Sequence, residues 1–83
     1  MTKMHEIKIK PKYYVDVITG MKTFELREND RDYQVGDVVK LMEWNEEGFT
    51  GRYYTITITY VLKDCREYGL ADGCCIFGWR CSE

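Results

Sequence analysis

The sequence predicts a small, mostly β, α+β fold that is barrel-like, with one helix after the first strand. Three observations support this prediction. The chain has 83 residues, the size of one domain. Hydrophobic residues make up 45% and aromatic residues 14%, which excludes a disordered chain. Residues 53–62 alternate between two faces over their whole length, and turn-forming residues separate the shorter apolar segments.

The first third of the chain predicts a strand, a helix and a second strand. Residues 5–10 alternate between polar and apolar side chains, as in a strand. Residues 12–19 carry apolar side chains three and four positions apart, which indicates a short helix. Pro11 suits the first turn of that helix and Gly20 suits its end. Residues 22–27 alternate again and predict the next strand.

The alternation in this second strand also predicts how its side chains are distributed. We expect Phe24 and Leu26 to face the core because both are apolar. Glu25 and Arg27 would then share the opposite face, where they could pair with each other or contact a ligand.

The remainder of the chain predicts three more strands joined by turns. These strands are residues 38–44, 53–62 and 74–80. The longest is the segment 53–62, in which β-branched residues recur throughout. We expect its side chains Tyr54, Ile56, Ile58 and Tyr60 to face the barrel interior.

Several polar residues have an ordinary structural interpretation. Asn29 and Asp32 lie in a polar turn, where such side chains bond to the backbone. Gly36 and Asp37 are expected to form another turn. His5, the only histidine, is expected to be a partly exposed residue at the start of a strand.

The charge balance excludes a strongly basic nucleic-acid-binding protein, because 12 basic and 14 acidic residues give a net charge of −2. Residues 1–31 nevertheless hold seven basic and five acidic residues, a local excess of two positive charges. A basic surface patch drawn from this first third is therefore expected.

The four cysteines do not predict a metal site or a disulfide framework. They are Cys65, Cys74, Cys75 and Cys81, and no two are spaced as in a C-x-x-C pair. We expect reduced thiols, no metal and no cofactor. The sequence has no apolar run near the ~18 residues of a membrane span and no signal-peptide pattern, so we expect a cytoplasmic protein without a membrane partner.

Two motifs carry a resemblance to a known family. Residues 20–27 read G-x-K-T-x-E-x-R, and residues 29–37 read N-D-R-D-x-x-x-G-D. Together with residues 4–9 and 53–62, they resemble the ASCH-type branch of the PUA-like superfamily. Within it, the chain is most similar to a small uncharacterised family of phage and bacterial domains. The resemblance runs over residues 4–79.

The resemblance implies a PUA-like β-barrel whose relatives are generally proposed to bind RNA in a cleft beside the helix. The expected function is therefore binding of RNA or a nucleotide-like ligand beside the helix of residues 12–19. Cationic side chains would contact phosphate, and aromatic rings would stack on bases. The candidate residues for this role are Lys22, Arg27, Arg31, Tyr13 and Tyr33.

An alternative follows from one ASCH relative, an amidohydrolase that removes an acetyl group from acetylated cytidine. Its catalytic lysine corresponds to Lys22, its catalytic threonine is replaced by Glu25, and its downstream glutamate has no counterpart placed here. Under this alternative, Lys22 and Glu25 are the catalytic candidates. A second alternative is a phage-encoded domain that binds a host protein through its acidic C-terminal half. Whether the chain is an enzyme, and its oligomeric state, stay open at this point.

Overall fold

The computed structural model describes residues 3–80 of the chain. Its elements are β1 (Met4–Ile9), α1 (Pro11–Ile18), β2 (Phe24–Glu28), β3 (Val38–Asn45), β4 (Gly48–Lys63), a 3₁₀ turn (Arg66–Tyr68) and β5 (Cys74–Trp79). This order confirms the prediction of a mostly β fold with one helix after the first strand.

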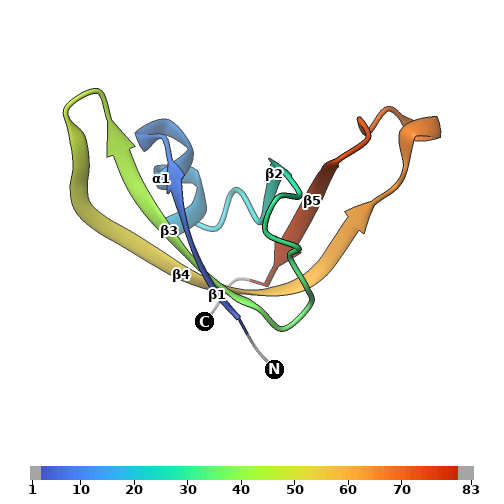
Figure 1. Cartoon of the computed structure of the whole chain (residues 1–83). Coiled ribbons are helices and arrows are strands. Elements are labelled where there is room, and N and C mark those ends of the chain that lie inside the picture. Colours follow the sequence, from blue (N-terminus) through green and yellow to red (C-terminus); the bar gives the residue numbers. More distant parts are fainter. Residues whose placement is uncertain (1–2, 81–83) are drawn as a thin grey trace.

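The five strands form one strongly curved sheet in the order β1-β3-β4-β5-β2. β1 runs parallel to β3, and all other neighbours are antiparallel. Figure 1 shows two wings, one built from β1, β3 and α1 and the other from β2 and β5, which are joined by the long β4. Within the described residues no ladder pairs β1 with β2, so the sheet is open where a closed barrel was expected.

The helix starts at Pro11 because proline fixes the backbone angle of a first helical turn and its missing N–H costs nothing there. Its inner side chains, Tyr14 and Val17, are buried. The Tyr14 hydroxyl donates to the backbone oxygen of Tyr53 at 3.1 Å, which ties the helix to β4. The chain leaves the helix through Gly20, whose positive φ of 82° suits glycine.

The hydrophobic core is shared by both wings. Its buried side chains are Ile7, Ile9, Tyr14, Val17, Tyr33, Val39, Leu41, Ile56, Ile58, Cys75, Phe77 and Trp79. They come from every strand except β2, from the helix, and from the segment before β3. β2 therefore lies at the margin of the core.

The predicted orientation of β2 is wrong. Phe24 and Leu26 are 51% and 58% exposed, whereas Glu25 is only 6% exposed. The side chains of β2 do alternate between two faces, but a period of two does not say which set of side chains faces inward. Because β2 is an edge strand beside polar partners, its inner positions hold an ion-pair cluster in which Glu25 bonds to Lys22 and Arg27.

β4 is the longest strand, as predicted, and Ile56 and Ile58 are buried in the interior. Tyr54 is half-buried and packs against the core. The expectation for Tyr60 is wrong, because this side chain is 65% exposed. The ladder to β5 shifts register between Ile58 and Tyr60, and this irregularity moves the following residues to the opposite face.

The outer face of β2, β5 and β4 carries a row of apolar side chains. Leu26 is paired with Ile76 of β5, and Ile76 is paired with Leu62 of β4. Cross-strand neighbours of this kind contact one another. These mutual contacts account for the apolar residues on this exposed face of the strands.

The described residues contain no group of three or more His, Cys, Asp and Glu side chains that could hold a metal ion. Cys65, Cys74 and Cys75 are free thiols, and Cys81 lies outside the described residues. Burial raises the pKa of the Cys75 thiol. No helix among residues 3–80 is long and apolar enough to cross a membrane.

Ile58 is 1% exposed whereas its neighbour Thr57 is exposed, so substitutions at the two positions should differ sharply in cost. We predict that Ile58→Ala lowers the free energy of unfolding by about 2–5 kcal/mol. Thr57→Ala should cost much less, because it leaves no cavity. Urea unfolding measures both values, and equal losses would show that the faces of β4 are misassigned.

Candidate functional site at the seam between the edge strands

Two arginine side chains bridge the edge strands that the backbone leaves unpaired. The Arg27 guanidinium donates through Nη2 to the backbone oxygen of Lys8, and Arg31 donates through Nη1 to that of Glu6 at 2.8 Å. We call the region defined by these four residues the seam. The arginines satisfy carbonyl groups that an edge strand otherwise leaves without a protein partner.

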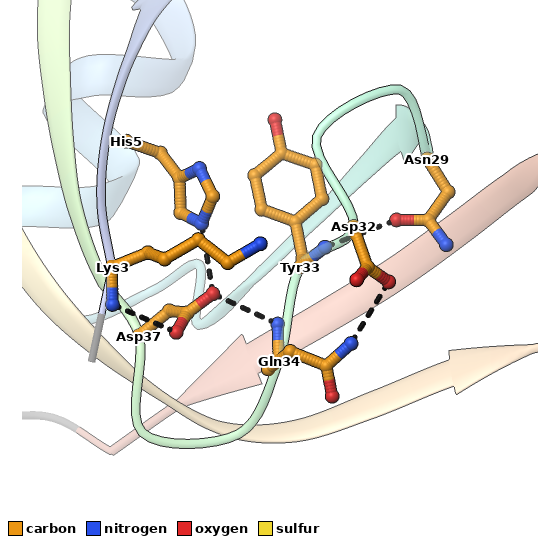
Figure 2. A network of polar contacts seen from close by, with 7 residues as sticks. All are labelled: Lys3, His5, Asn29, Asp32, Tyr33, Gln34 and Asp37. Carbon is orange, nitrogen blue, oxygen red and sulfur yellow. Dashed lines mark hydrogen bonds and ion pairs between the residues drawn. The ribbon is translucent and has the colours of Figure 1, made fainter. Parts of the chain in front are cut away.

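The turn after β2 brings Arg31 back toward β1. The backbone N–H of Asn29 donates to Gly73 at 2.8 Å, and its side-chain oxygen accepts from the N–H of Tyr33 at 3.2 Å. Asp32 has a positive φ of 49° and accepts a bond from the Gln34 side chain. Figure 2 shows the contact of Asn29 with Tyr33 and that of Asp32 with Gln34. The predicted bond to the backbone is confirmed for the Asn29 side chain, whereas the Asp32 side chain bonds to another side chain.

Glu25 is the centre of a compact ion-pair cluster. Its Oε1 lies 2.5 Å from Lys22 Nζ, and its Oε2 accepts from Arg27 Nε at 2.8 Å. The backbone N–H of Lys22 donates to Asp16 of the helix at 2.9 Å, which fixes where β2 begins. The pairing of Glu25 with Arg27 that the sequence allowed is therefore present, and Lys22 joins it. Arg31 makes no hydrogen bond to these residues in the described chain and bonds to β1 instead.

Two cavities lie on either side of Arg27. The first, of about 270 Å³, is lined by Glu6, Ile7, Lys8, Arg27, Glu28, Asp30, Arg31, Tyr33, Met42 and Phe49. The second, of about 400 Å³, is lined by Lys8, Ile9, Lys10, Tyr13, Glu25, Leu26, Arg27 and Glu28. Both include Lys8, Arg27 and Glu28. The two cavities, which we call the two compartments, therefore adjoin at Arg27.

Tyr33 lines the first cavity but does not offer its ring for stacking. The residue is 2% exposed, and its ring centroid lies 4.7 Å from both the His5 and the Phe77 rings. In Figure 2 its hydroxyl points away from the hydrogen bonds of the turn. Burial raises the pKa of this hydroxyl, against the opposing influence of Arg31 and Arg27. It therefore stays protonated at neutral pH and can act as a donor.

Tyr13, the second aromatic candidate, is 40% exposed and lines the second cavity. Ammonium groups of Lys22 and Lys12 lie 4.7 and 4.9 Å from its ring centroid. The second cavity is consequently next to the helix, as the sequence predicted for the cleft.

His5 and Asp37 form a buried pair that the sequence did not predict. His5 is 6% exposed, not partly exposed as expected, and its Nε2 lies 2.8 Å from Asp37 Oδ2. The Asp37 carboxylate also accepts from the backbone N–H groups of Lys3 and Gln34 (Figure 2). Burial alone would raise the pKa of Asp37, but the hydrogen bonds from His5, Lys3 and Gln34 together hold it below its ordinary value.

Glu43 and Arg52 form a second buried cluster that sequence reasoning missed. Glu43 lies on the inner face of β3 and is 2% exposed. It accepts two bonds from Arg52, both at 2.8 Å, and one from Thr50 at 2.7 Å. These hydrogen bonds, the ones from Arg52 first, hold the pKa of Glu43 below its ordinary value. Neither Glu43 nor Arg52 lines either of the two cavities beside Arg27.

The seam can bind a ligand more readily than it can act as a base. Both carboxylate oxygens of Glu25 already accept bonds from cations, and the Lys22 amine is directed at Glu25. Either group would have to break a charged pair before moving a proton. By contrast, no carboxylate in the described part of the chain forms an ion pair with Arg31.

We predict that Glu25→Gln lowers the free energy of unfolding by about 1–3 kcal/mol, because Lys22 and Arg27 lose their common counter-ion. Glu28→Gln is the matched control on the same strand, since Glu28 is exposed and forms no ion pair in the described chain. Thermal unfolding of both variants measures the difference. A Glu25 variant as stable as the control would show that the cluster contributes no net stability.

The Asp37 pair predicts a specific pH dependence. The folded-state pKa of Asp37 lies below the ordinary value of 3.8, so its stabilising contribution is present above pH 3.8 and is lost as pH falls through the folded-state pKa. Asp37→Asn should therefore lower stability at pH 7 and flatten the loss of stability in this acid range.

Denaturant unfolding between pH 2 and pH 7 tests this prediction. Asp72→Asn is the control, because Asp72 takes part only in an exposed ion pair, which contributes little. If Asp37→Asn lost stability with falling pH as steeply as the unmodified chain does, the lowered pKa of Asp37 would be contradicted.

Comparison with known proteins places the chain in a family. Residues 4–79 match the family described as a domain of unknown function, DUF3850. The chain is also similar to an uncharacterized 12.9 kDa protein in the GpA 3' region of Escherichia phage P2, with 44% identity over 61 residues. That match covers 74% of this chain and 56% of the phage protein, so the chain spans about half the length of this relative. The expectation of a phage-type family is thereby supported, while the ASCH-type resemblance stays a prediction. Because the family match extends from β1 to the end of β5, the chain belongs to the DUF3850 family.

Proposed function

We propose that this chain is a binding module that takes a nucleotide-like ligand at the seam. The observation that carries the proposal is the placement of Arg27 and Arg31. Both guanidinium groups line the first cavity, and each reaches β1 through one nitrogen. An arginine presents five N–H donors in a planar fork, so donors remain that can bind phosphate or the edge of a base.

The charges at the seam favour a single nucleotide over a long RNA strand. The first cavity is lined by three cationic side chains and by three carboxylates, namely Lys8, Arg27, Arg31, Glu6, Glu28 and Asp30. The chain as a whole has a net charge of −2. Binding along many phosphates requires a broad positive surface, which this composition does not provide. A single nucleotide bound in the two compartments needs hydrogen-bond donors only within those compartments.

Hydrolysis of acetylated cytidine is the second candidate. It is favoured by the 2.5 Å contact between Lys22 Nζ and Glu25 Oε1, which joins the two catalytic candidates in a half-buried position. It is disfavoured by the second bond to Glu25 from Arg27. Under this candidate, Lys22→Ala and Glu25→Gln would each abolish turnover while binding persists.

We predict that NMR titration with ribonucleosides, ribonucleotides and short RNAs shifts backbone signals at Glu6, Lys8, Arg27, Arg31 and Tyr33. Arg31→Ala should weaken binding about tenfold, because it removes a charged donor from the ligand. Arg66→Ala is the control, because Arg66 is exposed and lies outside both cavities.

Three outcomes would contradict the proposal. Shifts that cluster away from the seam would place the ligand elsewhere. Turnover of acetylated cytidine, lost in Lys22→Ala, would favour the hydrolase. Absence of binding by every nucleoside, nucleotide and RNA would leave a host protein, bound through the acidic C-terminal half, as the leading candidate.

A further inference from the structure

The Tyr33 hydroxyl is the group in the seam that most directly indicates a ligand. Its ring is locked between His5 and Phe77, so the hydroxyl cannot move far. No hydrogen bond joins this hydroxyl to any residue of the described range 3–80, and no buried side-chain oxygen or nitrogen in that range lacks a partner. The hydroxyl is therefore accessible, although the residue as a whole is 2% exposed and lines the first cavity. A tyrosine whose ring is packed usually gives its hydroxyl a partner. A ligand in the first cavity could supply that partner.

The first cavity offers donors for an anion beside this hydroxyl, although its lining carries as many carboxylates as cations. Arg31 and Arg27 act to lower the pKa of the Tyr33 hydroxyl, whereas burial, Asp30 and Cys75 raise it, and the pKa is raised overall. Among the described residues Arg31 donates through Nη1 to the backbone oxygen of Glu6, which leaves its other donors available. A neutral donor in a cavity that two arginines also line is suited to a phosphate monoester, which carries about −2 charge at pH 7 and accepts through three oxygens.

The second compartment has a different character. Ile9, Leu26 and Tyr13 contribute apolar or aromatic surface. The rest of its lining is charged and consists of Lys8, Lys10, Glu25, Arg27 and Glu28. Flat heteroaromatic rings bind against such surfaces. Because Arg27 separates the compartments, a ligand that fills both must pass over its side chain.

From this division, which rests on the proposed nucleotide-binding function, we infer that the ligand is a nucleoside monophosphate. Its phosphate lies in the first cavity, between Arg31 and the Tyr33 hydroxyl, and its base lies in the second cavity beside Tyr13. The sugar spans Arg27. Asp30 lines the phosphate compartment and opposes the anion, so the site holds one phosphate weakly enough to exchange it.

Calorimetric titration of the full chain with the four ribonucleoside 5'-monophosphates, each compared with its nucleoside and with inorganic phosphate, tests this inference. The monophosphate should bind at least about tenfold more tightly than either part. Tyr33→Phe keeps the packed ring and removes only the hydroxyl, so it should weaken monophosphate binding about fivefold to tenfold and leave nucleoside binding unchanged. Tyr68→Phe is the matched control, because Tyr68 is 87% exposed and lines neither cavity.

Two variants that each remove a charge should change the affinity for the monophosphate in opposite directions. Arg31→Gln should weaken monophosphate binding and Asp30→Asn should strengthen it, and each change should be larger than the change in affinity for the matching nucleoside. Thermal unfolding of each variant without ligand establishes that it is folded before its affinity is interpreted.

The outcomes separate this inference from the proposed function. Equal affinity for a nucleoside and its monophosphate would overturn the phosphate assignment and leave nucleotide-like binding at the seam intact. Equal affinity for inorganic phosphate and the monophosphate would overturn the base assignment. Tighter binding of an unphosphorylated RNA oligonucleotide than of any monophosphate would replace the inferred ligand by an RNA strand. If none of these probes binds, both the inference and the proposed function are wrong.

Discussion

The bonds from Arg27 and Arg31 to the backbone of β1 are the contacts on which the arrangement of the site depends. A curved sheet of five strands leaves two edges facing each other, and backbone pairing does not join them here. The two guanidinium groups cover this gap without filling it. A backbone ladder would have removed the cavities, whereas side chains close the fold and leave a depression on each side of Arg27. The closure of the fold and the two cavities therefore depend on the same side chains.

Glu25 makes this arrangement possible, because it orients Arg27 from its own strand. Glu25 Oε2 lies 2.8 Å from Arg27 Nε and 2.7 Å from Arg27 Nη2, and Nη2 also donates to the backbone oxygen of Lys8. A positioned guanidinium loses less conformational entropy on binding than a free one does. The cluster thus holds the Arg27 side chain in a fixed position between the two cavities, instead of leaving it mobile at the surface.

The sequence predicted the type and order of the elements because these depend on local periodicity. It did not predict the face of β2, since the rule that apolar residues face inward fails for an edge strand whose inner side meets Lys22 and Arg27. The exposure of Tyr60 was missed for a related reason, because an irregularity in a ladder leaves no signal in the alternation itself. The Lys22, Glu25 and Arg27 cluster could be predicted because its members lie within six positions of one another. The His5 and Asp37 pair could not, because its partners come from segments that only the parallel pairing of β1 with β3 brings together.

The pairing of β2 with β5 has a consequence for biosynthesis. β2 has a single neighbour in the sheet, and Phe24 is paired with Gly78 near the other end of the chain. During translation β2 therefore stays without its ladder until β5 has also left the ribosome, and its apolar side chains stay unshielded for that time. Such non-local pairing slows folding. Arg27 and the other side chains of β2 reach their places only after β5 has paired, so a nascent chain that lacks β5 lacks the seam.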